Sequence, residues 1–117
     1  MNQLIERIFE NFAVNGELVP VRFLDYNGHG EPYVTYMQTN SDYILRADDN
    51  LQMYVDYYDF DVFAKGSYLD VIRGVTAVLE NNGFVLRPER SGPDMFETDT
   101  EYYHKTLSFS CFRLDSE

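Results

Sequence analysis

The stretch LQMYVDYYDFDVFAK, residues 51–65, constrains the fold more than any other part of the chain. It is the longest segment of strand-forming residues, so it predicts one extended strand. Side chains alternate in a strand, which places Asp59 and Asp61 on one face and Asp56 on the other. The predicted core-facing set is Tyr58, Phe60, Val62 and Ala64. The more apolar residues upstream stand in the opposite phase, which predicts a bulge or a strong twist near residues 56–58.

Two helices are predicted on either side of the strand-rich region. Residues 2–14 place apolar side chains at helical spacing opposite charged ones, and Asn15-Gly16 is a plausible stop. The second helix is predicted to begin at Ser67, where Ser-x-x-Asp resembles a capping box, and to end at Asn-Asn-Gly. Gly74 lies inside this helix and is expected to permit close packing.

The remaining segments predict further strands. They are residues 17–26, 32–39 continuing through 42–47, 84–87 and 100–114, with turns at 27–32 and 48–50. The last strand alternates Leu107, Phe109 and Cys111 with serines and a threonine, which predicts one wet face. The element order is α-β-β-β-α-β-β. The predicted class is α+β, with two helices on one face of an antiparallel sheet of about four to five strands, in a single domain spanning residues 1–117.

The charge balance limits the classes of partner. There are 20 acidic and nine basic residues, a formal net charge of −11. Specific nucleic-acid binding and attachment to an anionic membrane both need clustered basic residues, so neither is predicted. Basic or mixed-charge proteins are the expected partners. A single cysteine and an N-terminal stretch with charged residues predict an intracellular chain without an internal disulfide or a membrane span.

The aspartates, the two histidines, the cysteine and one glycine motif are the candidates for a catalytic or ligand-binding site. The aspartates of residues 56–61 would need converging ligands to bind a metal or to hydrolyse a substrate, and only Asp48 and Asp49 across the turn are offered. His29 and His104 have no metal-ligand spacing, and Cys111 alternates with core residues. The Gly-x-Gly of residues 27–32 lacks the third glycine of a dinucleotide loop. We therefore predict no catalytic residue, no metal site and no cofactor.

Several short sequence segments resemble those of a known protein family. A short amphipathic helix leads to VPVRF, then come PYVTY at 32–36 and FDVFAK at 60–65, and a Tyr-rich strand follows ENNGF. This arrangement resembles the small tail-terminator and tail-completion proteins of long-tailed phages and Gram-positive prophages, often labelled minor tail or minor capsid proteins. The resemblance implies a non-enzymatic virion protein of the tail and neck, assembled in the host cytoplasm. It also implies self-association in a ring, commonly hexameric, on the tail tube protein, with a docking surface for the head connector.

Six residues are predicted to contact a partner, because of their expected exposure and their position in the chain. They are His29, Tyr57, Asp59, Asp61, Arg87 and Arg90. Tyr-rich strand edges suit the heterologous contacts of a ring, and an acidic lumen would repel passing DNA. The alternative is an acidic inhibitor or immunity-type protein that binds a cationic protein, because acidic surfaces steer onto basic active sites. A carboxylate enzyme that uses Asp59 is the third hypothesis.

Overall fold

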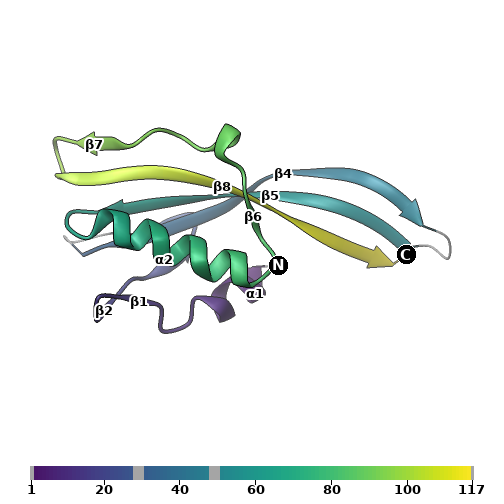
Figure 1. Cartoon of the computed structure of the whole chain (residues 1–117), viewed down its shortest axis with the longest axis horizontal. Helices are drawn as coiled ribbons and strands as arrows, with labels where there is room; N and C mark the ends of the chain where they lie inside the picture. Colours follow the sequence, from purple (N-terminus) through teal and green to yellow (C-terminus); the bar gives the residue numbers. More distant parts are fainter. Residues whose placement is uncertain (1, 28–30, 48–50, 117) are drawn as a thin grey trace.

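The computed structural model describes residues 2–27, 31–47 and 51–116. His29, Asp48 and Asp49, and most of the two turns predicted around them, lie outside the described residues. Within the described part the chain is α+β, with two α-helices and eight strands, and it measures 52 × 27 × 22 Å (Figure 1). The elements are α1 (Asn2–Ile8), β1 (Ala13–Val14), β2 (Glu17–Leu18), β3 (Val21–Phe23), β4 (Tyr33–Ala47), β5 (Leu51–Ala64), α2 (Tyr68–Asn81), β6 (Val85–Leu86), the 3-10 helix η1 (Pro88–Arg90), β7 (Met95–Glu97) and β8 (Tyr102–Ser116).

The main sheet is mixed, not antiparallel throughout. Its order is β3-β4-β5-β8-β6, with β7 also paired to β8, and β1 and β2 form a separate hairpin. The long strands β4, β5 and β8 are antiparallel, as predicted, but β3 runs parallel to β4. The antiparallel prediction is wrong at β3 because the parallel pairing places Val21 beside Val34, where both side chains are buried.

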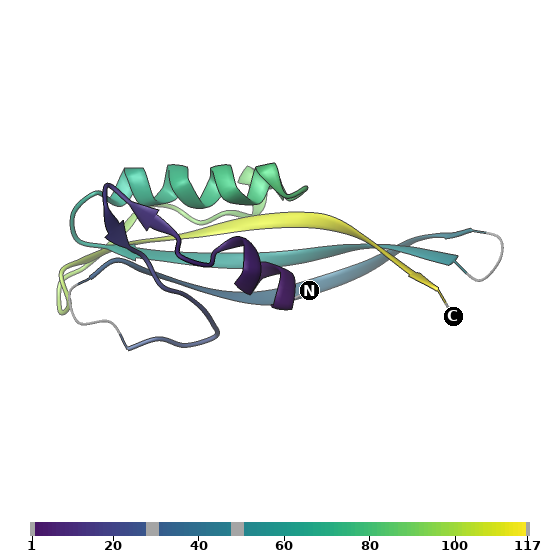
Figure 2. The same ribbon diagram turned by 90° about the horizontal axis from the view of Figure 1, so that it is seen from below.

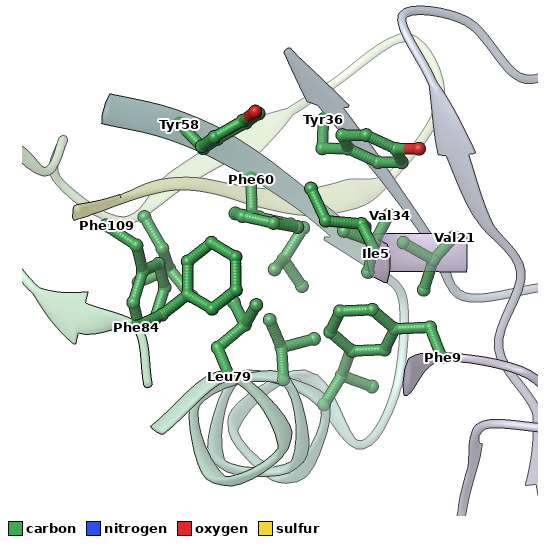
Figure 3. Packing of buried hydrophobic residues seen from close by; sticks show 14 of the residues in the cluster. Ile5, Phe9, Val21, Val34, Tyr36, Tyr58, Phe60, Leu79, Phe84 and Phe109 are labelled. Atoms are coloured by element: carbon green, nitrogen blue, oxygen red, sulfur yellow. The ribbon is translucent and has the colours of Figure 1, made fainter. Parts of the chain in front are cut away.

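The core lies between the sheet and the two helices (Figure 3). Phe60 is fully buried at its centre, with the rings of Phe9, Tyr36 and Phe109 at centroid distances of 6.1, 5.6 and 5.8 Å. Along β5 the predicted core-facing set is confirmed: Tyr58, Phe60, Val62 and Ala64 are all buried. Gly74 of α2 meets Phe12 and Val14 so closely that an added Cβ would lie 3.1 Å from Phe12 Cζ, which confirms the predicted close packing.

The N-terminal helix is shorter than predicted. It ends at Ile8 rather than residue 14, and Asn11 adopts a left-handed conformation with φ 58°. The change of direction carries Phe12 and Val14 onto α2, and burial there outweighs the helical pattern of the sequence. Asn15 and Gly16, the predicted helix stop, form the turn of the β1–β2 hairpin, where both have positive φ.

The predicted capping box of the second helix is also wrong. The helix begins at Tyr68, and Ser67 has φ 54° and makes no side-chain cap hydrogen bond. Asn15 Nδ2 instead donates to Asp70 Oδ2 at 2.9 Å and approaches Ser67 Oγ at 3.4 Å. These side chains tie the β1–β2 turn to the start of α2, so a tertiary contact has replaced the local cap. The helix ends at Asn81, before Gly83 with its positive φ, as predicted.

The bulge predicted in the long strand lies in its neighbour. β5 pairs with β8 without a shift from residue 51 to 64, so β5 itself has no bulge near 56–58. The register shift falls in β4, between Gln38 and Asn40, whose partners are Tyr58 and Tyr57. A second shift in β4 separates Tyr43 from Leu45. The extra residues therefore lie in β4, an outer strand of the arm, and not in the central strand β5.

The three long strands continue well past both helices (Figure 2). We call this extension the arm and define it as residues 39–47, 51–56 and 111–116. Strand β3 pairs only with residues 34–36 of β4, and β6 and β7 pair with residues 102–110 of β8. Among the strands that the structure describes, none pairs with the outer edge of β4 or of β8 within the arm. The arm is thus a three-stranded sheet with two free edges.

Candidate functional site

The face of the sheet that points away from α2 holds the sequence-predicted interface residues that the structure describes. We call it the open face. Tyr57, Asp59 and Asp61 lie on it along β5, because the core takes the alternate side chains. Opposite them on β8 stand Ser110, Ser108 and Thr106. The loop that follows β6 brings Arg87 and Arg90 to the same region. The strand alternation and the loop together assemble five of the six predicted residues.

Arginine side chains cover the part of the open face nearest the arm. The Arg90 guanidinium lies over the Tyr57 ring, 4.1 Å from its centroid. Arg87 Nε donates to Ser110 Oγ at 2.8 Å, and the Arg87 amide donates to the Ser108 carbonyl. Ser108 and Ser110 are consequently buried, so the wet face predicted for the last strand is wrong at these two positions. The Pro/Gly-containing loop is what covers them.

Asp59 and Asp61 have different surroundings. Burial raises the pKa of Asp59 and the neighbouring Asp61 carboxylate raises it further, whereas Ser108 and Arg90 act to lower it. Asp61 accepts a hydrogen bond from Thr106 Oγ1, and its Oδ1 lies 3.3 Å from His104 Nε2. Burial therefore disfavours the negative charge of Asp59, whereas Asp61 is paired with side chains of the neighbouring strand β8.

A row of stacked rings runs across the open face beyond the aspartates. Tyr33, Phe63 and His104 are directly paired on β4, β5 and β8. The Phe63 ring stacks on Tyr33 at 4.6 Å and on His104 at 4.1 Å. His104 Nδ1 also lies 3.6 Å from Glu97 Oε2 of β7. These contacts join four strands, and they explain why His104 is half-buried although sequence reasoning placed it on a solvated face.

The most buried charged side chain among the described residues was not one of the predicted interface residues. Asp56 is only 1% exposed and lies on the helix side, where Arg113 Nε donates to its Oδ2 at 2.7 Å. Ser41 Oγ donates to Asp56 Oδ1 at 2.6 Å, and Arg113 also lies over the Tyr54 ring at 4.4 Å. These residues stand where the arm leaves the helix-covered body. Alternation does place Asp56 opposite Asp59, as predicted, but the partner lies 57 residues away in the sequence.

The polar groups of the open face make hydrogen bonds and a cation–π contact between neighbouring strands and loops. Thr106 donates to Asp61, Arg87 to Ser110, and Arg90 covers Tyr57, so each of these groups contacts a neighbour in the same molecule. Among the described residues no group of three or more His, Cys, Asp or Glu side chains is placed to hold a metal ion. Burial raises the pKa of the Cys111 thiol to about 11, which keeps it protonated at neutral pH.

The sequence was compared with protein-family models and with curated proteins. The chain matches no protein-family model and no curated protein. Among the described residues, no helix is both long enough and apolar enough to cross a membrane.

Proposed function

We propose that this chain is a structural, non-enzymatic protein of the head–tail interface of a long-tailed phage or prophage. In this role it is a tail terminator, which forms a ring on the end of the tail tube and presents a surface to the head connector. The observation that carries the proposal is the arm. Its free strand edges and exposed apolar side chains are a surface that a monomer leaves in water and that an assembly can bury.

The two segments that best match the family pattern lie side by side in the fold. PYVTY at 32–36 leads into β4, which begins at Tyr33, and FDVFAK at 60–65 contains the end of β5 at Ala64. The two are antiparallel neighbours, with Tyr33 paired to Phe63 and Tyr36 paired to Phe60. They make one structural unit of the body, so they count as a single point of similarity.

The acidic composition suits a ring through which DNA passes. With a net charge of −11, a ring of several copies carries a large negative charge, and a lumen of this sign repels the DNA backbone. The exposed carboxylates of Glu6 on α1 and of Glu10 just after it contribute to this field. The DNA would slide past such a surface and would not be retained by it.

The proposal is tested with the tail-tube protein of the same phage or prophage. Purified protein is added during tube assembly, and tube lengths and tube ends are measured by electron microscopy. The proposal expects a ring of density at one end and an end to tube growth. Tubes of unchanged length, with no density at either end, would overturn it. Self-association of the protein without tubes is not required for this outcome.

The second candidate is an acidic inhibitor or immunity-type protein. The net charge of −11 favours it, and Glu6 and Glu10 line a shallow hollow beside α1 together with Gln3 and Arg7. The neighbouring genes discriminate the two proposals. Head, connector and tail genes on either side support the tail terminator, whereas an adjacent gene for a cationic toxin supports the inhibitor. Inhibition of that toxin by the purified chain would then replace the first proposal.

A further inference from the structure

The open face of the arm carries an apolar ladder in which Val55 is buried and the two members on β8 are exposed. Val55 pairs with Phe112, and Met53 pairs with Leu114, on adjacent strands. Phe112 is 64% exposed and Leu114 is 57% exposed. Asp42 of β4 stands opposite Val55 and is also exposed. We call these five residues the distal patch.

A second apolar surface lies at the other end of the body, where α2 begins. The Tyr103 ring contacts Tyr68 of α2 and Phe96 of β7 at centroid distances of 5.4 and 5.0 Å. Leu69, 57% exposed, lies beside them, and a hollow of about 410 Å³ opens between α2 and β8. We call the surface formed by Tyr68, Leu69, Phe96 and Tyr103 the proximal patch.

The two patches carry single charges of opposite sign. Lys65, Asp70 and Arg73 line the hollow of the proximal patch, where Arg73 pairs with Asp70 at 3.1 Å, and the adjacent Lys105 pairs with Asp94 at 3.6 Å. Lys65 makes no ion pair with another described residue and lies over the Tyr102 ring. The distal patch carries the exposed carboxylate of Asp42. An apolar surface with an exposed aspartate is thus matched by an apolar surface with a lysine that has no acidic partner in the described part of the chain.

One copy of the chain cannot bring its own patches together. The molecule is 52 Å long, the arm extends from one end of it, and α2 begins near the other end (Figure 1). Continuous pairing of β5 with β8 over residues 51–64 keeps the long strands in one sheet. Contact between the patches therefore requires a second molecule.

We propose that the distal patch of one copy docks on the proximal patch of a second copy of this chain. Such a contact is heterologous, because it joins two different surfaces, and repetition of it builds a ring when the rotation closes. Docking of two distal patches on each other would bring Asp42 of both copies together, and like charges disfavour that contact. The inference rests on the proposed ring and names the surfaces that form it.

The first test measures self-association by analytical ultracentrifugation up to the solubility limit. The distal variant Phe112→Ser/Leu114→Ser and the proximal variant Leu69→Ser/Phe96→Ser are each expected to weaken it by at least about tenfold, because exposed apolar anchors dominate an interface. An equal mixture of the two variants is expected to form mixed dimers and nothing larger, since each pair retains one intact interface. The matched control, Leu18→Ser/Leu24→Ser, changes two other exposed leucines and is expected to associate as the unmodified chain does.

The second test exchanges the charges. Asp42→Lys and Lys65→Glu are each expected to weaken self-association, and the double variant is expected to recover most of the loss. The docking proposal is overturned if the unmodified chain stays monomeric throughout, if the distal variant associates normally, or if the mixture of variants does not recover dimers. In the tube assay, a distal variant that still forms rings on tubes overturns the docking and leaves the tail-terminator proposal standing. If the chain self-associates through the two patches but has no effect on tubes, the docking proposal stands and the tail-terminator proposal is overturned.

Discussion

The body and the arm of this molecule use the same three strands in different surroundings. In the body, α1 and α2 cover one face of the sheet, and the side chains of Val34, Phe60 and Phe109 are completely buried. In the arm, Phe112 and Leu114 of the same strand β8 lie on the open face, opposite the helices, and are mostly exposed. The helices also end before the arm (Figure 2). A strand sequence rich in apolar residues therefore does not by itself indicate a core. The cover on its face decides whether those residues stabilise the monomer or remain available to a partner.

The largest expected difference between the two regions comes from removing one phenyl ring in each. Phe60→Ala deletes a fully buried ring and leaves a cavity, so we expect the free energy of unfolding to fall by about 3–5 kcal/mol. Phe112→Ala removes an exposed ring and should change it by less than about 0.5 kcal/mol. Urea unfolding followed by circular dichroism measures both. Similar losses for the two variants would mean that the arm is covered in the monomer.

The ion pair at the junction of body and arm gives the next largest effect. Arg113→Met leaves the buried Asp56 carboxylate without its main cation, so we expect a loss of about 3 kcal/mol. Asp56→Asn combined with Arg113→Met removes both charges and should recover much of that loss. The same unfolding experiment at low and high salt checks the pair. A loss below about 0.5 kcal/mol for Arg113→Met would show that the junction is well solvated.

A methyl group added inside the body tests how tightly its layers pack. Gly74→Ala favours the helix by about 1 kcal/mol, but its Cβ would meet Phe12 and Val14 at 3.1–3.3 Å, and such overpacking costs about 1–3 kcal/mol. We therefore expect a net loss of about 1 kcal/mol in the free energy of unfolding. Gly66→Ala is the matched control, because an added Cβ meets nothing within 4 Å there. Stabilisation by Gly74→Ala would contradict this expectation, because it would mean that Phe12 and Val14 move away from the added Cβ at little cost in free energy.

The smallest effect concerns Asp59, between the rings of the open face and the arm. Its pKa is raised in the folded chain, chiefly by burial, so its ionised form is disfavoured by folding at neutral pH. Asp59→Asn should therefore stabilise the chain by a few tenths of a kcal/mol at pH 7. The gain should disappear as the pH falls below the ordinary pKa of 3.8, where Asp59 is protonated in both the folded and unfolded chain. Destabilisation at pH 7 would contradict the shift, and Asp42→Asn in the arm provides an exposed control.

Much of the local structure follows from the sequence for a physical reason. Alternation requires that Tyr58, Phe60 and Val62 share a face, so the core side of β5 and the outward position of Asp59 and Asp61 could be predicted. The apolar stripe and the glycine at residue 83 likewise locate the second helix. The candidate site was predicted in part, because Tyr57 and the two aspartates follow from alternation alone. The contact of Arg90 with Tyr57 does not, since it depends on the path of a loop.

Only the tertiary structure decided the remaining features, because each depends on residues far apart in the chain. The parallel pairing of β3, the shortened first helix and the left-handed Ser67 arise where burial or a distant side chain competes with local preference. The partner of Asp56 is another such feature, since Arg113 is brought to it by the pairing of β5 with β8. The sequence by itself determined that residues 51–64 form a strand and which side chains share its faces. The tertiary structure placed the helices on one face of the body, which made that face the core and left the apolar residues on the open face of the arm exposed.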